Sequence, residues 1–170
     1  MDVKINKLTA DGFLLSEVSR LSKRGVSIAV DFDSTICLTD GYPHIVGPNS
    51  GCFSTLHKWQ DMGCKILLHT MRHDEDLDMA VNWCKEQGFT FDGINCNPEN
   101  DDRDPYCDKM YAVFYIDDKA FGVPLLRDND GIVRDHVDWY EIDRTFTPLL
   151  EEIIIKLNEN SKWLGKDLCS

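Results

Sequence analysis

The sequence predicts an α/β fold with a mainly parallel sheet, arranged as a Rossmann-like three-layer sandwich. Strand-like and helix-like segments alternate along the chain from residue 26 onward, which is typical of α/β proteins. The strand-like segments are almost wholly apolar, as expected of strands buried on both faces of a parallel sheet. A chain of 170 residues is long enough to bury one substantial core, so we expect a single domain over residues 1–170.

The first predicted strand covers residues 26–32, which read VSIAVDF and are rich in β-branched and apolar side chains. A helix is expected at 53–62, because its apolar residues recur at helical spacing. Ser50 is a possible N-cap of this helix, and Gly63 is a stop signal. A second buried strand is predicted at 64–70, where the sequence reads CKILLHT.

The clearest helical pattern covers residues 74–88, where the apolar side chains fall on one face. Asp74 can cap this helix, and Gly88 ends it. A short strand is predicted at 91–94, and a polar loop follows at 95–108.

The fourth predicted strand covers residues 110–118, which read MYAVFYIDD. A turn is expected at 128–131, in the sequence DNDG. The pair Thr147-Pro148 is a favourable N-cap and first-turn residue, so a last helix is expected from there to about Leu157.

We divide the expected domain into three parts. Residues 1–25 form an N-terminal extension, in which the apolar spacing at 9–22 predicts a helix. Residues 26–126 carry the strands and the sequence motifs described below. Residues 127–170 are expected to form a C-terminal hairpin and helix.

Composition limits the classes of partner. The net charge of −12 should repel nucleic acids and anionic membranes at long range. No run of 18 apolar residues is present, so no membrane-spanning helix is expected, and the N-terminus lacks the apolar segment of a signal peptide. The seven cysteines are odd in number and contain no CxxC spacing, which favours reduced thiols in a cytoplasmic protein over a disulfide framework or a zinc site.

Chemically reactive residues stand where predicted strands end: Asp31 and Asp33 after the first, Thr70 and Arg72 after the second, and Asp117 and Asp118 after the fourth, with Lys109 just before the fourth. Functional residues of open parallel sheets gather at the carboxyl ends of the strands. If these strands are neighbours, the side chains therefore converge at one edge of the sheet.

Clustered carboxylates repel one another and lose solvation, so a divalent cation is expected among them. Mg²⁺ typically binds one or two carboxylates together with waters and phosphate oxygens. The hydroxyl of Thr70 and the ammonium of Lys109 can then bind phosphate oxygens. A carboxylate can attack phosphorus to give an aspartyl-phosphate, and a second carboxyl can act as general acid and base.

This pattern resembles the haloacid dehalogenase-like (HAD) hydrolase superfamily, most members of which are phosphatases. Four motifs carry the resemblance, in the family's order: Asp31-Phe32-Asp33-Ser34-Thr35, the strand Ile66-Leu67-Leu68-His69-Thr70, Lys109, and Ile116-Asp117-Asp118. The resemblance covers about residues 26–126. One departure is Ser34, where the family usually has glycine.

The resemblance implies a role for each motif residue. Asp31 is the expected nucleophile and Asp33 the general acid and base. Thr70 and Lys109 are expected to bind the transferring phosphoryl group. The implied Mg²⁺ ligands are Asp31, the backbone carbonyl of Asp33, and Asp117, with Asp118 in support.

Four nearby residues need separate interpretation. Lys119 lies two residues from Asp117 and is an alternative to Lys109 as the phosphate-binding lysine. Arg72 can bind a substrate phosphate or anchor its own loop. His69 and His73 flank the second motif, but their spacing does not indicate a metal site, and we expect them to be packing or loop residues.

Members of the superfamily often carry cap domains inserted after the first or second motif. The gaps from Thr35 to Cys64 and from Thr70 to Lys109 are too short for a cap. The chain is therefore similar to the small capless phosphatases of the superfamily, and an open site is expected.

We therefore expect a Mg²⁺-dependent phosphoric monoester hydrolase that acts on a small phosphorylated metabolite, either a sugar phosphate or a nucleotide. A polynucleotide 3′-phosphatase is an alternative within the enzyme class, but the acidic charge and the lack of a basic stripe disfavour it. A non-enzymatic module phosphorylated on aspartate, like a receiver domain, would have its motifs in a different order. A binding protein that has lost activity is disfavoured because every catalytic position is filled.

Overall fold

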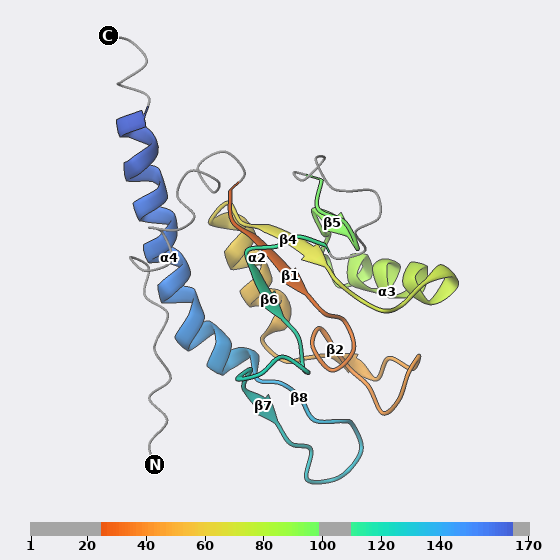
Figure 1. The fold of residues 1–170 in the computed structure, drawn as a ribbon. Helices are drawn as coiled ribbons and strands as arrows, with labels where there is room; N and C mark the ends of the chain where they lie inside the picture. The colour runs from red at the N-terminus through yellow and green to blue at the C-terminus, as the bar shows by residue number, and fades with distance from the viewer. Residues whose placement is uncertain (1–24, 99–109, 165–170) are drawn as a thin grey trace.

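The structure, a computed structural model, describes residues 25–98 and 110–164. Its central sheet has four parallel strands in the order β5-β4-β1-β6 (Figure 1). Their bounds are β1 Ser27–Val30, β4 Lys65–Leu68, β5 Gly93–Ile94 and β6 Phe114–Ile116. The prediction of an α/β fold with a mainly parallel sheet is confirmed.

Each of these strands is shorter than its predicted segment, because the residues at the segment ends leave the sheet. Residues 110–113, for example, precede β6 without joining it. Residues 32 and 117 likewise follow their strands as turn or loop backbone. The apolar pattern extends beyond the strands because these flanking residues are also partly or wholly buried.

Three helices pack around the sheet: α2 Cys52–Asp61, α3 Asp74–Glu86 and α4 Trp139–Leu164. The main core joins one face of the sheet to all three, through Ile28, Val30, Ile66 and Leu68 on the strands, Leu56 and Trp59 on α2, Ala80 and Cys84 on α3, and Ile142, Leu150 and Ile153 on α4. Side chains alternate along strands, so Ala29 and Leu67 face the other way, where they contact Met110 and Ala112. The helix predicted at 9–22 lies outside the described residues.

The predicted N-caps of α2 and α3 are wrong by one residue. Gly51, not Ser50, caps α2, with φ at 82°, a conformation that glycine adopts without steric cost. His73 caps α3, and Asp74 is its first helical residue. Three acidic residues occupy the first turn of α3, where they interact favourably with the helix dipole.

The last helix begins much earlier than predicted, at Trp139, and Pro148 lies inside it. Two interactions fix the earlier start. A carboxylate oxygen of Asp138 accepts a hydrogen bond from the backbone N–H of Glu141 at 3.1 Å, which satisfies a free donor of the first turn. The side chain of Trp139 is fully buried, and its Nε1 donates to the carbonyl of Thr35 at 2.7 Å.

Two small antiparallel pairs lie beyond the carboxyl end of the sheet (Figure 1). Strands β2 (Cys37–Leu38) and β3 (Gly47–Pro48) form one, and β7 (Leu125–Leu126) and β8 (His136–Val137) form the other. The β2–β3 pair and α2 account for the regular structure between residues 35 and 64, so no further domain is inserted there. In the described part of the chain, no helix is both long and apolar enough to cross a membrane.

Candidate active site

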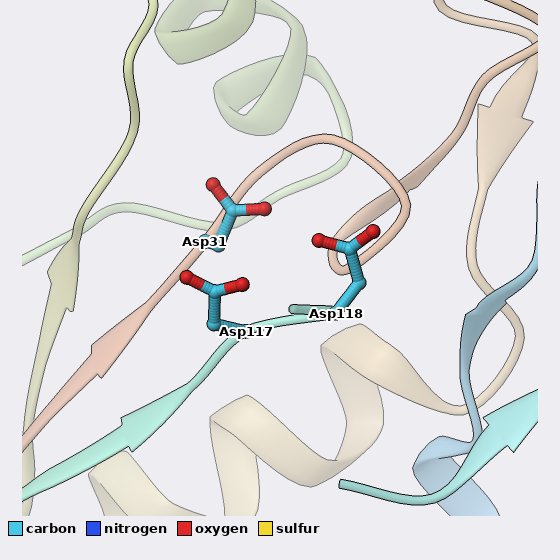
Figure 2. A group of neighbouring side chains, drawn as sticks. All are labelled: Asp31, Asp117 and Asp118. Atoms are coloured by element: carbon cyan, nitrogen blue, oxygen red, sulfur yellow. The ribbon is translucent and has the colours of Figure 1, made fainter. Parts of the chain in front are cut away.

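Three carboxylates meet where β1 and β6 end, as the strand-end pattern predicts (Figure 2). Asp31 follows β1, and Asp117 and Asp118 follow β6. The backbone N–H of Asp31 donates to the carbonyl of Ile116 at 2.9 Å, which carries the β1–β6 pairing one residue past the strand. Each carboxylate offers one oxygen, and these oxygens lie within 4.8 Å of one another.

The environment of Asp31 opposes its ionisation. Burial raises the pKa of this carboxyl from 3.8 to about 7, with smaller increases from the charges of Asp117, Asp118 and Asp33, although the backbone N–H of Phe32 lowers it. A cation bound among the three carboxylates would reverse this effect, because it favours their ionised forms. Carboxylate oxygens are hard donors, so the cluster fits Mg²⁺ in the type of its ligands.

Thr35 connects the carboxylate that follows β1 with the segment that follows β6. Its hydroxyl donates to Asp31 at 3.2 Å and accepts a hydrogen bond from the backbone N–H of Asp118 at 3.1 Å. Thr35 is fully buried, so its position is fixed by the surrounding core. Thr35 belongs to the first sequence motif, but the motif alone predicts no role for it at the site.

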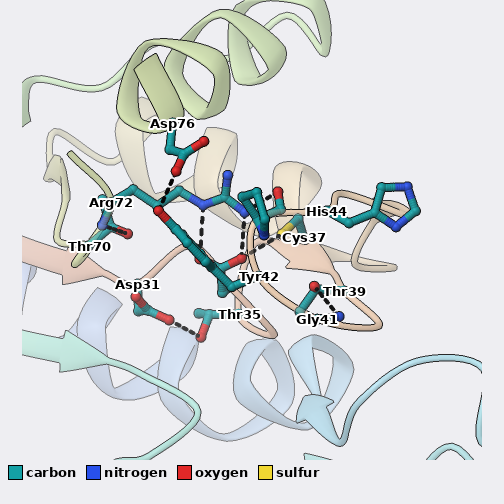
Figure 3. Close-up of polar contacts among 12 residues, drawn as sticks. Asp31, Thr35, Cys37, Thr39, Gly41, Tyr42, His44, Thr70, Arg72 and Asp76 are labelled. Carbon is teal, nitrogen blue, oxygen red and sulfur yellow. Dashed lines mark hydrogen bonds and ion pairs between the residues drawn. The ribbon is translucent and has the colours of Figure 1, made fainter. Parts of the chain in front are cut away.

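The carboxylate of Asp33 is not part of this cluster and pairs instead with Arg72, whose side chain Figure 3 shows. The Nε and Nη2 atoms of Arg72 donate to its two oxygens at 2.9 and 2.7 Å, and Nη2 also donates to the carbonyl of Pro43 at 2.9 Å. The guanidinium is fully buried and lies over the rings of Phe32 and Tyr42. Of the two roles left open for Arg72, these contacts favour an anchoring role; whether Asp33 contributes its backbone carbonyl to a metal stays a prediction.

Thr70 follows β4 and lines the same pocket as the carboxylates. Its backbone N–H donates to the side-chain oxygen of Asn95 at 2.8 Å, and its hydroxyl accepts from the backbone N–H of Arg72 at 3.2 Å. Lys109 lies outside the described residues. Lys119 also lines the pocket, where its ammonium pairs with Asp118.

A pocket of about 520 Å³ opens over the carboxylates. Besides the residues above, it is lined by Ser34, Thr39, Tyr42, His69, Met71, His73 and Arg134. His69 and His73 lie in the loop after β4, as expected, and both also line this pocket. Tyr42, Met71 and Arg134 were not anticipated, because they come from loops whose sequences carry no periodic pattern or motif.

The backbone conformation of Ser34 indicates why glycine is usual at this position in the superfamily that the motifs resemble. Its φ of 58° lies in the left-handed region, which glycine adopts readily and other residues at a cost of about 1 kcal/mol. The residue is buried, and its carbonyl accepts a hydrogen bond from the backbone N–H of Val137 at 2.9 Å. The loop therefore keeps this conformation without glycine.

A comparison with protein-family models and with curated protein sequences finds no match. Among solved structures, this chain is similar to a conserved protein from Bacteroides thetaiotaomicron, with a TM-score of 0.58 and 28% sequence identity. The similarity covers 72% of this chain and 89% of that one. It supports the α/β fold and does not identify an activity.

Proposed function

We propose that this protein is a Mg²⁺-dependent phosphatase that hydrolyses a phosphomonoester through an aspartyl-phosphate on Asp31. The observation that carries the proposal is the group of three carboxylates, with ligand oxygens within 4.8 Å, in a pocket that also contains Thr70 and Lys119. Three of the four ordered motifs, those of Asp31, Thr70 and Asp117-Asp118, meet in this pocket, which supports a member of the HAD-like superfamily of the capless type.

Asp31, Asp117 and the backbone carbonyl of Asp33 are the proposed metal ligands, with Asp118 in support. When bound, Mg²⁺ would neutralise the carboxylates and offset the charge that develops on the phosphoryl oxygens. Thr70 and one lysine, Lys109 or Lys119, are the proposed phosphate-binding residues.

In the first step, a carboxylate oxygen of Asp31 attacks phosphorus while the bond from phosphorus to the leaving oxygen breaks. Asp33 gives its proton to that oxygen and releases an alcohol. In the second step, Asp33 takes a proton from water as the water oxygen attacks phosphorus. The bond between Asp31 and phosphorus breaks, inorganic phosphate leaves, and both aspartates return to their starting states.

Arg72 is proposed to hold Asp33 as a carboxylate at the pocket between turnovers; to act as the acid, Asp33 must turn one oxygen from Arg72 toward the pocket and take up a proton from solvent. Arg72 holds the two carboxylate oxygens of Asp33 in a fixed plane, and the Asp33 side chain keeps 28% of its surface exposed. That movement is needed because proton transfer requires hydrogen-bond contact between the carboxyl of Asp33 and the reacting oxygen.

The proposed substrate is a small phosphorylated metabolite in the cytoplasm. The acidic chain disfavours polyanions. All five described cysteines are free, and four of them are buried: Cys37, Cys52, Cys64 and Cys84. Burial raises the pKa of Cys64 and of Cys84 to about 12, so these thiols suit a reducing compartment as inert core residues.

The first experiment measures release of p-nitrophenol from p-nitrophenyl phosphate with Mg²⁺ or with EDTA, for the wild type and Asp31→Asn. We expect turnover that needs Mg²⁺ and falls at least about 1000-fold in the variant, because the amide cannot act as nucleophile. Asp61→Asn is the matched control, since it removes the same charge at an exposed position outside the pocket. Turnover in EDTA, or equal activity in Asp31→Asn, would contradict the proposal.

A further inference from the structure

The exposed side of the pocket differs in chemistry from the side that holds the carboxylates. We define the outer wall as the pocket-lining residues Tyr42, Met71, His73 and Arg134, all of which are exposed. Tyr42 is 53% exposed and Met71 is 97% exposed, so an aromatic ring and a thioether face solvent beside a strongly polar site. Such a pocket suits a ligand with an anionic end and a flat, weakly polar end.

The ring of Tyr42 is held firmly in place (Figure 3). The guanidinium carbon of Arg72 lies 5.3 Å from the ring centroid, and the Tyr42 hydroxyl donates to the carboxylate of Asp76. The loop that carries the ring is also tied, because the backbone N–H of Gly41 donates to the Thr39 hydroxyl at 3.0 Å. An exposed ring fixed by these contacts loses little conformational freedom when a ligand stacks on it.

Arg134 brings hydrogen-bond donors to the same part of the wall. Its backbone N–H donates to the carbonyl of Thr39 at 2.8 Å, which joins the β7–β8 loop to the loop of Tyr42. The Arg134 side chain also lies close to Gly41: a methyl group added to this glycine would be 3.6 Å from Arg134 Nη2. Among the described residues, the Arg134 side chain forms no salt bridge within 4.0 Å, although its charge acts on the carboxylate of Asp40 and is one of the smaller causes of the lowered pKa of that group.

We propose that the pocket binds a nucleoside monophosphate, with the phosphate at the carboxylates and the base stacked on Tyr42. This inference rests on the proposed phosphatase function and adds the class of substrate. Hydrolysis would break the bond between phosphorus and the ribose oxygen, with water supplying the new oxygen on phosphate and a proton for the nucleoside.

The size and lining of the pocket favour this occupant over a sugar phosphate. A volume of about 520 Å³ lies within the range of pockets that hold small organic ligands, and a phosphate group alone would leave most of it empty. A nucleotide carries the same sugar and phosphate and adds a flat base, for which Tyr42 and Met71 offer a ring face and a polarisable thioether. A polynucleotide is disfavoured by the charge of −12.

The test compares kcat/KM for nucleoside 5′-monophosphates and 3′-monophosphates with kcat/KM for ribose 5-phosphate, which has the same sugar and phosphate without a base. We expect at least one mononucleotide to exceed ribose 5-phosphate by about 10-fold or more, the size expected of one base–aromatic stack. Tyr42→Leu should reduce this ratio about 10-fold, whereas Tyr42→Phe should keep most of it, because the ring and its contact with Arg72 remain although the hydrogen bond to Asp76 is lost. Arg134→Gln should reduce the ratio less than Tyr42→Leu.

The outcomes separate this inference from the phosphatase proposal. Hydrolysis of p-nitrophenyl phosphate with equal kcat/KM for mononucleotides and ribose 5-phosphate would overturn the nucleotide inference and leave the phosphatase proposal standing. A preference for a 3′-phosphorylated oligonucleotide over the mononucleotide would also overturn it. If no phosphate ester is hydrolysed but AMP binds in calorimetry and binds more weakly to Tyr42→Leu, the base-binding wall is supported and the phosphatase proposal fails.

Discussion

At the scale of single residues, Asp31 links the chemistry of the site to the stability of the fold. Its pKa is raised to about 7 by burial, so the folded protein keeps a proton there that the unfolded chain releases near pH 4. The stabilisation that this group contributes to the folded state is therefore complete below about pH 4 and is lost progressively as the pH rises to about 7. In EDTA, the free energy of unfolding should fall by about 2–3 kcal/mol between pH 5 and pH 8.

Urea unfolding at a series of pH values tests this expectation. Asp31→Asn should flatten the curve, and Mg²⁺ should flatten it in the wild type if the proposed site binds the cation, because a bound cation would favour the ionised carboxylates of the folded state. The carboxyls whose pKa is lowered, such as Asp128 with its backbone hydrogen bonds, act mainly below pH 4 and so lie outside this window. Parallel curves for the wild type and Asp31→Asn would contradict the expectation.

The same residues show what the sequence could predict at this scale. Asp31, Asp117 and Thr70 each follow a continuous apolar strand, so a local pattern places them at one sheet edge. Tyr42 and Arg134 lie in loops that meet only in the folded chain, and no local pattern pairs them. The partner of Arg72 could not be predicted either, because Asp33 lies 39 positions away in the sequence.

At the scale of elements, Arg72 ties together the segments that follow β1, β2 and β4. Its contacts reach Asp33 and the carbonyl of Pro43, so Arg72→Met would leave a carboxylate without its buried partner. We expect Arg72→Met to cost about 3 kcal/mol of unfolding free energy, measured by urea unfolding in EDTA. Arg72→Lys should cost nearly as much unfolding free energy, since one ammonium cannot replace the planar, bidentate contact.

Arg144→Met is the matched control, because Arg144 pairs with Glu141 on the exposed surface of α4 and should cost less than about 1 kcal/mol. If Asp33→Asn removes most of the penalty of Arg72→Met, the two side chains are energetically coupled as the geometry indicates. Equal losses in Arg72→Met and Arg144→Met would contradict the anchoring role.

The boundaries of the elements were less predictable than their order. The order of strands and helices follows from alternating local patterns. The start of α4 depends on the burial of Trp139 against the core and on a hydrogen bond to Thr35, both of which are tertiary interactions. The pair Thr147-Pro148 is a sound local start signal, but Thr147 instead accepts a hydrogen bond from Trp59 Nε1 at 2.8 Å within the helix packing.

At the scale of the whole molecule, the charge of −12 opposes the anionic substrate that the pocket is proposed to bind. The cationic groups lining the pocket are few, and the ammonium of Lys119 is already paired with Asp118. Long-range repulsion should therefore slow the approach of a dianionic phosphate ester, and salt should relieve it by screening. We expect kcat/KM for p-nitrophenyl phosphate to rise, by about two-fold or more, between 20 and 150 mM NaCl at fixed Mg²⁺.

The direction of this salt effect shows whether the negative net charge or the local positive charge at the pocket controls the approach of the substrate. If kcat/KM rises with salt, the net charge of the molecule controls the encounter, and the cation at the carboxylates acts only at short range. A fall with salt would contradict the expectation and would mean that the bound cation, Arg134 and nearby bases attract the substrate over distances near 10 Å, the screening length at 0.1 M. Arg134→Gln distinguishes these cases. If attraction controls the encounter, kcat/KM of the variant should fall less steeply with salt than that of the wild type. If repulsion controls it, kcat/KM of the variant should still rise with salt.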